Sequence, residues 1–361
     1  MNLHDLHARW HDHSHPHTHP HSHGHAHLHS HPMYARPHPI SRRTFLTAVG
    51  FGALSLRSLA QTPLAIATND APALAAIFKP FASRLDLKWD VDYLYVGSNG
   101  IPDHPMMIGI TAWQQQVPLP QDYYGPNAWR LPLKPVKAVH PLSAKEGFFR
   151  GAIALAADGI PIFNPIKNDG HTDTLLAGEL DQWGGHCGRA DDYHYHIAPV
   201  FLEKIVGKGN PIAVALDGYP IYGNTEPDGK PVNPSVLDAF NGHDDAHGNY
   251  HYYSTKTYPY INGGFHGAVA VAGGQVDPQP RCTPIRPAGR PLPGAIITDF
   301  ASPKPNTYQL TYEVDEEQRH IVYSIESDGT YHFDFIDGQG GHSYEVYRRD
   351  QNSNRPSPPP Q

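Results

Sequence analysis

One pattern that occurs twice constrains the fold of this chain more than any other feature of its sequence. Residues 153–164 contain an apolar run, an Asp-Gly pair and a second apolar run, and residues 212–223 repeat that order. An Asp-Gly pair accepts the positive backbone φ angle that a tight turn requires, so the apolar runs on either side predict two paired strands. The sequence therefore predicts two similar β-hairpins.

A segment of alternating tyrosine and histidine follows each hairpin. Residues 193–196 are Tyr-His-Tyr-His, and residues 250–253 are Tyr-His-Tyr-Tyr. The offset between these two segments is nearly the same as the offset between the Asp-Gly pairs, which stand at 158–159 and 217–218. Two features repeated at nearly one offset predict a duplicated unit, made of a hairpin and a histidine-bearing strand.

The histidines of these strands are candidate metal ligands. The period of a β-strand places His194 and His196 on one face and the tyrosines on the other, with the two histidine Cα atoms about 6.5–7 Å apart. His186 lies just upstream, and the second segment supplies His251. If the two strands pack as neighbours, His194, His196 and His251 converge. We therefore predict a metal site formed by His186, His194, His196 and His251.

Imidazole ligands favour Cu or Zn over Ca or Mg. An open coordination position would allow hydrolysis by zinc-bound water or redox chemistry at copper, and the sequence does not choose between them, or decide whether the protein is an enzyme. A second interpretation stays open. The imidazoles can instead bond to tyrosines and backbone in a metal-free core, which would make this a non-catalytic periplasmic binding or structural domain. Any small-molecule or extracellular ligand is unknown.

Composition favours a mainly β, β-rich α+β architecture. The 37 prolines and 33 glycines leave little room for long helices, and they predict long Pro/Gly loops. A few short helices are expected, over residues 71–78, 175–183 and 234–240, and alternating segments over residues 308–348 predict a β meander. The net charge of −8 argues against nucleic acid as a partner.

The segment 1–60 has the pattern of an export signal. Residues 1–40 are rich in histidine and form no packed core. Residues 41–60 begin with Ser41, Arg42 and Arg43 and continue in a short, interrupted apolar run, which is typical of a twin-arginine signal and too short for a membrane span. We therefore expect a periplasmic or secreted mature chain with no membrane span. The histidine tract is either discarded with the signal or lies upstream of a start at Met33.

The two cysteines leave a choice between two roles. Cys187 and Cys282 would both reach an oxidising compartment after export, where a disulfide between them is expected. The alternative role for Cys187, which follows His186 directly, is that of a metal-bound thiolate.

With these motifs in view, the chain resembles the YHYH-domain family, whose name describes the tyrosine–histidine strand. The resemblance runs from about residue 97 to residue 267 and implies one domain over residues 61–300. Residues 301–350 would pack on it as the meander, and residues 351–361 would form a disordered tail. The family occurs largely in exported proteins, and the resemblance implies no particular reaction. Its motifs are residues 98–102 (Ser-Asn-Gly-Ile-Pro), 158–159, 185–186, 193–196, 217–223 and 250–252.

Overall fold

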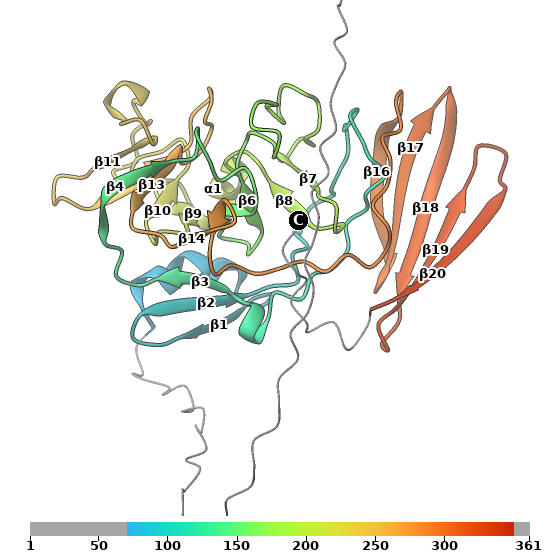
Figure 1. Ribbon diagram of the computed structural model, residues 1–361, viewed down its shortest axis with the longest axis horizontal. Helices are drawn as coiled ribbons and strands as arrows, with labels where there is room; N and C mark the ends of the chain where they lie inside the picture. Colours follow the sequence, from blue (N-terminus) through green and yellow to red (C-terminus); the bar gives the residue numbers. More distant parts are fainter. Residues whose placement is uncertain (1–70, 350–361) are drawn as a thin grey trace, which may run out of the picture. The chain divides into compact units, whose positions relative to one another are not determined.

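The two predicted copies form the two halves of one eight-stranded sheet in the computed structural model, which describes residues 71–349 (Figure 1). The predicted leader (1–40), signal segment (41–60) and tail (351–361) lie outside these residues. The strand order is β11-β12-β10-β9-β5-β6-β8-β7. The eight strands are β5 (Ala152–Ala156), β6 (Pro161–Phe163), β7 (Gly185–Cys187), β8 (Tyr193–Tyr195), β9 (Pro211–Ala215), β10 (Pro220–Tyr222), β11 (Gly242–Asp244) and β12 (Tyr250–Tyr253).

The register at the centre of the sheet shows that the copies are related by a local two-fold axis. We call residues 152–196 the first copy and residues 211–253 the second. Strands β5 and β9 pair antiparallel, with Leu155 opposite Val214. At the offset of the hairpins Val214 is the counterpart of Leu155, so the pair maps onto itself when the copies are exchanged. The central strands are almost entirely buried. The duplication predicted from the sequence is confirmed, and the axis passes through its most apolar strands.

Each copy adds a strand that sequence inspection did not anticipate. In the first copy β6 pairs parallel to β8, and β8 pairs antiparallel to β7; in the second, β10 pairs parallel to β12, and β12 pairs antiparallel to β11. The outermost strands begin at Gly185 and Gly242. A Cβ atom at either glycine would collide with the hydroxyl of a tyrosine on the neighbouring strand, so both positions require glycine.

The predicted hairpin turns are present in both copies. Gly159 and Gly218 have φ angles of 81° and 93°, which are the positive values expected of the Asp-Gly pairs. The preceding aspartates, Asp158 and Asp217, each accept a hydrogen bond from the backbone N–H two residues further on. These contacts fix the carboxylates beside the sheet.

The remaining strands form four smaller sheets, and the mainly β prediction is confirmed. The predicted C-terminal meander is an antiparallel sheet of five strands (Figure 1). The strands are β1 (Asp86–Trp89), β2 (Tyr93–Gly97) and β3 (Trp129–Pro132); β4 (Lys137–Ser143) with β13 (Gly264–Gly267); β14 (Val271–Ala272) with β15 (Gln275–Val276); and β16 (Ile296–Lys304), β17 (Thr307–Val314), β18 (Glu317–Ile325), β19 (Thr330–Ile336) and β20 (His342–Arg348).

The helices differ in type and extent from those that the sequence suggests. The segment expected at residues 71–78 is a 3₁₀ helix, η1 (Ala73–Phe81), and the one expected at 234–240 is reduced to η4 (Pro234–Val236), capped by the Asn233 side chain. The helix expected over residues 175–183 is wrong, since that segment consists of turns and irregular backbone. The other helices are η2 (Gly125–Asn127), η3 (Val200–Leu202) and α1 (Glu203–Val206).

Contacts from the C-terminal part of the chain hold the loop that leads into β8. The Arg286 guanidinium donates to both carboxylate oxygens of Asp191, at 2.8 Å each, and Tyr323 of β18 donates to the Pro118 carbonyl. Asp191 has a φ of 58° and also accepts from the Val117 N–H. This anchored residue stands just before the strand that carries the candidate ligands.

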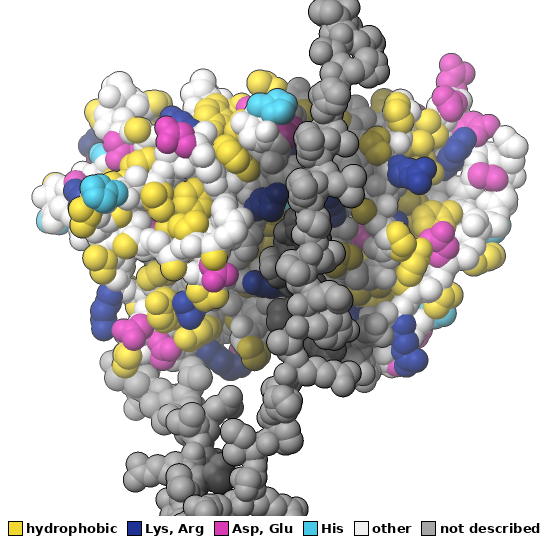
Figure 2. All heavy atoms as spheres, viewed as in Figure 1, with side chains coloured by type: hydrophobic (Ala, Val, Ile, Leu, Met, Phe, Trp, Pro, Cys, Tyr) yellow, Lys and Arg dark blue, Asp and Glu magenta, His cyan; other side chains and the backbone are white. Residues whose placement is uncertain are grey.

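Lys, Arg, Asp and Glu side chains are interspersed over the described part of the face drawn in Figure 2. Within residues 71–349, none of the helices has the length and hydrophobicity needed to cross a bilayer.

Candidate metal centre

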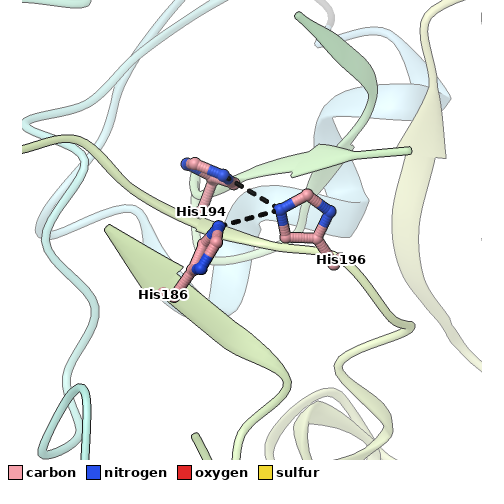
Figure 3. Close-up of side chains that lie close together, drawn as sticks. All are labelled: His186, His194 and His196. Atoms are coloured by element: carbon pink, nitrogen blue, oxygen red, sulfur yellow. Dashed lines mark hydrogen bonds between the residues drawn. The ribbon is translucent and has the colours of Figure 1, made fainter. Parts of the chain in front are cut away.

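Three histidines converge at the end of the first copy. His186 on β7 lies directly opposite His194 on β8, and His196 follows two residues later on the same face as His194. The Nε2 atom of His196 lies 3.1 Å from Nε2 of His194 and 3.0 Å from Nε2 of His186 (Figure 3). We call His186, His194 and His196 the first cluster. All three present the same ring nitrogen to a common point.

The opposite ring nitrogens identify the tautomer. Nδ1 of His194 lies 2.9 Å from the Asp192 carbonyl oxygen, and Nδ1 of His196 lies 2.5 Å from the Asn164 carbonyl oxygen. A carbonyl only accepts, so both Nδ1 atoms carry the proton. The Nε2 atoms then present lone pairs to each other. Backbone acceptors that orient metal-bound histidines through Nδ1 are a common feature of metal sites.

Burial disfavours protonation of His186 and His196. His194 and His196 are 3% and 5% exposed. Burial lowers the pKa of His186 and of His196 well below the usual value for histidine, and the neighbouring imidazoles lower both further. The rings of His194 and His196, with Nδ1 protonated, bring two acceptor nitrogens together without a donor between them. A cation bound by the Nε2 atoms would satisfy all three.

The spacing of the nitrogens also suits a metal ion. Zn–N bonds of about 2.0–2.1 Å in a tetrahedron separate the nitrogens by about 3.3 Å. The observed separations of 3.0 and 3.1 Å are within a few tenths of an ångström of that edge. A small adjustment of the side chains would accommodate the ion.

The surroundings of the first cluster restrict ring movement and add charge at its edge. Phe163 stacks on His194 with ring centroids 4.0 Å apart. The Lys167 ammonium pairs with Glu179 Oε1 at 2.6 Å, while Glu179 Oε2 lies 4.0 Å from Nδ1 of His186. At 4.0 Å the carboxylate does not hydrogen-bond to His186, but a small movement of either side chain would let it accept from Nδ1 when the ring binds a cation through Nε2.

The tyrosines point to the opposite face, as the strand period predicts. Tyr193 donates to Asp181 at 2.8 Å, and Tyr195 donates to Asp158 at 2.9 Å. Their hydroxyls do not contact the imidazoles of the first cluster, which removes one basis of the metal-free core described above. Asp158 acts as a turn residue and as an acceptor for Tyr195.

His251 does not join the first cluster, so the prediction that it converges with His194 and His196 is wrong. Strands β10, β9, β5 and β6 lie between β12 and β8, a separation of about 24 Å at the usual strand spacing. The two-fold axis explains this outcome because it sends the equivalent strands to opposite ends of the sheet. His251 lies instead with His243 and Glu226, which we call the second cluster.

Sequence inspection did not select His243, Glu226 or Glu179 as site residues. A signal was available for the first of these, because Gly242-His243 repeats Gly185-His186 at the offset that separates the Tyr-His strands. No comparable pattern marks the two glutamates, which come from irregular segments whose path depends on the fold.

The expected disulfide is not formed, and Cys187 is not part of the first cluster. Both cysteines are free. Cys282 Sγ lies 3.0 Å from the Tyr123 hydroxyl, and Cys187 is buried, on the face of β7 opposite to His186. Burial raises the pKa of the Cys187 thiol well above its ordinary value, which disfavours a thiolate there.

Comparison with known proteins agrees with the motif resemblance in part. Residues 128–235 match the family model described as YHYH protein. This range contains the first cluster and ends before His243 and His251, so it is shorter than the range suggested by the motifs. Searches of curated proteins and of solved structures gave no match.

Proposed function

We propose that this chain is an exported metal-binding protein that holds one Cu or Zn ion through His186, His194 and His196. The convergence of three buried Nε2 atoms, with two Nδ1 atoms held by backbone carbonyls, is the observation that carries the proposal. Three neutral imidazoles suit both metals, and neither a thiolate nor a carboxylate lies in this cluster to favour one of them. The bound ion would supply Lewis-acid or redox chemistry at a position not filled by protein.

A small pocket lies beside the first cluster. It is lined by Met107, Trp113, Glu179, His186 and Cys187, among others. His186 is also the most exposed of the three ligands, with 17% of its side chain accessible. A fourth ligand would reach the ion from the His186 side, while His194 and His196 remain covered.

Metal content of the purified exported protein tests the proposal. We expect His196→Ala to bind one Cu or Zn ion fewer than the natural chain after competition with a chelator. His140→Ala, which removes an exposed histidine from β4, is the matched control and should bind as the natural chain does. The histidines between residues 4 and 38 do not affect the difference, since export removes or keeps them alike in every variant.

Equal metal content in His196→Ala and His140→Ala would contradict the metal site. If the metal-free chain were then as resistant to urea as the metal-treated one, the alternative of a binding or structural domain with a metal-free Tyr/His core would replace it. Folding of both variants is checked by circular dichroism, so that loss of metal through unfolding is recognised.

Export by the twin-arginine route is the second part of the proposal and rests on the sequence of residues 41–60. Replacing Arg42 and Arg43 by lysine should retain the protein in the cytoplasm, because the twin-arginine route reads that pair. Intact mass of the exported natural chain should place its N-terminus beyond residue 43. An N-terminus upstream of Arg42 in the exported protein would contradict this part alone.

A further inference from the structure

The second copy ends in a cluster that differs from the first in chemistry and lies at the opposite end of the sheet. We propose that Glu226, His243 and His251 form a second metal site, which binds a divalent transition metal through two imidazoles and a carboxylate, independently of the first cluster. This site does not depend on the function proposed above, since the two clusters share no residue.

The two imidazoles of this site repeat the geometry of the first cluster. His243 lies opposite His251 in register on β11 and β12, as His186 lies opposite His194. The ring centroids of His243 and His251 are 5.1 Å apart at 82°, against 4.9 Å and 86° in the first cluster. Asn249 stands at the position of the Asp192 whose carbonyl orients His194 in the first copy. The duplicated backbone therefore delivers the same pair of ligands twice.

The third ligand is where the copies diverge. Tyr253 occupies the position equivalent to His196, and it cannot supply an imidazole. Glu226 supplies the third ligand atom instead. Its Oε2 atom lies 3.7 Å from His243 Nε2 and accepts a hydrogen bond from the Tyr253 hydroxyl. That hydroxyl also lies 3.3 Å from His243 Nε2. The tyrosine thus holds the carboxylate against the imidazoles and is a further oxygen close to the site.

Charge supports a cation at this end of the sheet. Glu226 is the counterpart of Lys167 at the offset of the hairpins, so a carboxylate stands where the first copy has an ammonium group. A divalent cation bound at the second cluster would neutralise the negative charge of Glu226. In the first copy the equivalent residue is Lys167, whose positive charge already pairs with Glu179.

The ligand set indicates the class of metal. Two histidines and one carboxylate bind Zn²⁺ or Fe²⁺ in many proteins and leave positions open for water or substrate. His243 and Glu226 keep 27% and 19% of their side chains accessible, so this site is more open than the first cluster. Oxygen ligands and exposure both favour a divalent ion that exchanges readily.

Co²⁺, a spectroscopic substitute for Zn²⁺ and Fe²⁺, tests the site in the His196→Ala background, which disables the first cluster. We expect Glu226→Gln to weaken Co²⁺ binding by more than the ~10–100-fold that follows loss of an outer-shell partner. The matched control is Asp228→Asn, an exposed carboxylate two residues away whose partner is Lys230, and it should leave the affinity unchanged. The visible absorption of Co²⁺ is the readout, and binding by residues 4–38 cancels between the two variants.

Equal Co²⁺ affinity in Glu226→Gln and Asp228→Asn would overturn the proposal. If the His196→Ala background does not fold, the same pair is compared in the natural chain, where Glu226→Gln should remove one Co²⁺ and Asp228→Asn none. Failure of the first cluster would appear as no effect of His196→Ala on Cu or Zn content, so the two failures are distinguishable.

Discussion

The two copies share a scaffold and differ in what the scaffold carries. Tyr193 donates to Asp181 and Tyr250 donates to Asp238, both at 2.8 Å. In each copy the next tyrosine, two residues further on, donates to the aspartate of the hairpin turn. The aspartates and tyrosines that fix the outer strands are therefore retained in both copies.

The third ligand position and one charged position beside it, by contrast, have changed. His196 corresponds to Tyr253, and Lys167 corresponds to Glu226. A duplicated fold needs the Asp–Tyr pairs in both halves because each buried hydroxyl and carboxylate must find a partner. The histidine-bearing face of these strands is not needed to hold the strands in place, so its residues can vary. Structural and chemical roles are thus separated onto the two faces of the same strands.

The largest effect is expected from exchanging the third ligand. His196→Tyr gives the first copy the tyrosine of the second and should weaken Cu²⁺ binding there by about 1,000-fold, or about 4 kcal/mol, through loss of one of three imidazoles. Tyr253 is fully buried at the equivalent position, so this backbone accommodates a tyrosine. Competition titration measures the affinity.

The reciprocal variant, Tyr253→His, should give the second cluster a third nitrogen. Cu²⁺ electron paramagnetic resonance counts coordinated nitrogens, and in the His196→Ala background we expect three instead of two. A spectrum unchanged from that of the background alone would show that position 253 does not face the second site, and the comparison between copies would fail.

A second test concerns the two turn aspartates. Burial raises the pKa of both Asp158 and Asp217 to about 6, from the ordinary 3.8, against the lowering effect of the tyrosine hydroxyls. The folded state therefore keeps these protons between about pH 4 and pH 6 while the unfolded state has lost them. The resulting stabilisation is complete below about pH 4 and is lost as the pH rises through 6.

Asp217 should show this effect more strongly than Asp158. Asp217 is 1% exposed, whereas Asp158 is only half-buried and its interaction with solvent should reduce the shift. A rise of about two in pKa corresponds to about 3 kcal/mol. Asp217→Asn should therefore flatten the fall in unfolding free energy between pH 4 and pH 6, measured in urea, more than Asp158→Asn does. Equal slopes in both variants would mean that the two turns are electrostatically alike.

The sequence predicted correctly those features that depend on residues close together along the chain. Strand alternation placed His194 and His196 on one face, and the Asp-Gly turns defined the hairpins, because both depend on residues within a few positions of each other. The place of His251 could not be read in this way. A repeat offset does not say whether two equivalent strands become neighbours or opposite ends of a sheet; the pairing of β5 with β9 decides that.

The smallest difference between the two copies is expected in how much their Asp–Tyr pairs contribute to the free energy of unfolding. Asp181 is 6% exposed and accepts from the backbone N–H groups of Met107, Trp183 and Gly185, in addition to Tyr193. Its replacement by alanine leaves several buried donors without an acceptor, at about 1–3 kcal/mol for each group that water cannot reach.

Asp238 holds the equivalent position in the second copy but is exposed, so water can replace it. It accepts from the N–H groups of Phe240 and Gly242 and from Tyr250. We expect Asp181→Ala to lower the free energy of unfolding by about 3 kcal/mol and Asp238→Ala by about 1 kcal/mol, both measured in urea at pH 7. A loss in Asp238→Ala as large as that in Asp181→Ala would mean that exposure does not distinguish the copies. In that case the Asp–Tyr pairs would stabilise the strands equally in both copies. The greater solvent exposure of the second cluster would then be a property of its ligand side chains alone.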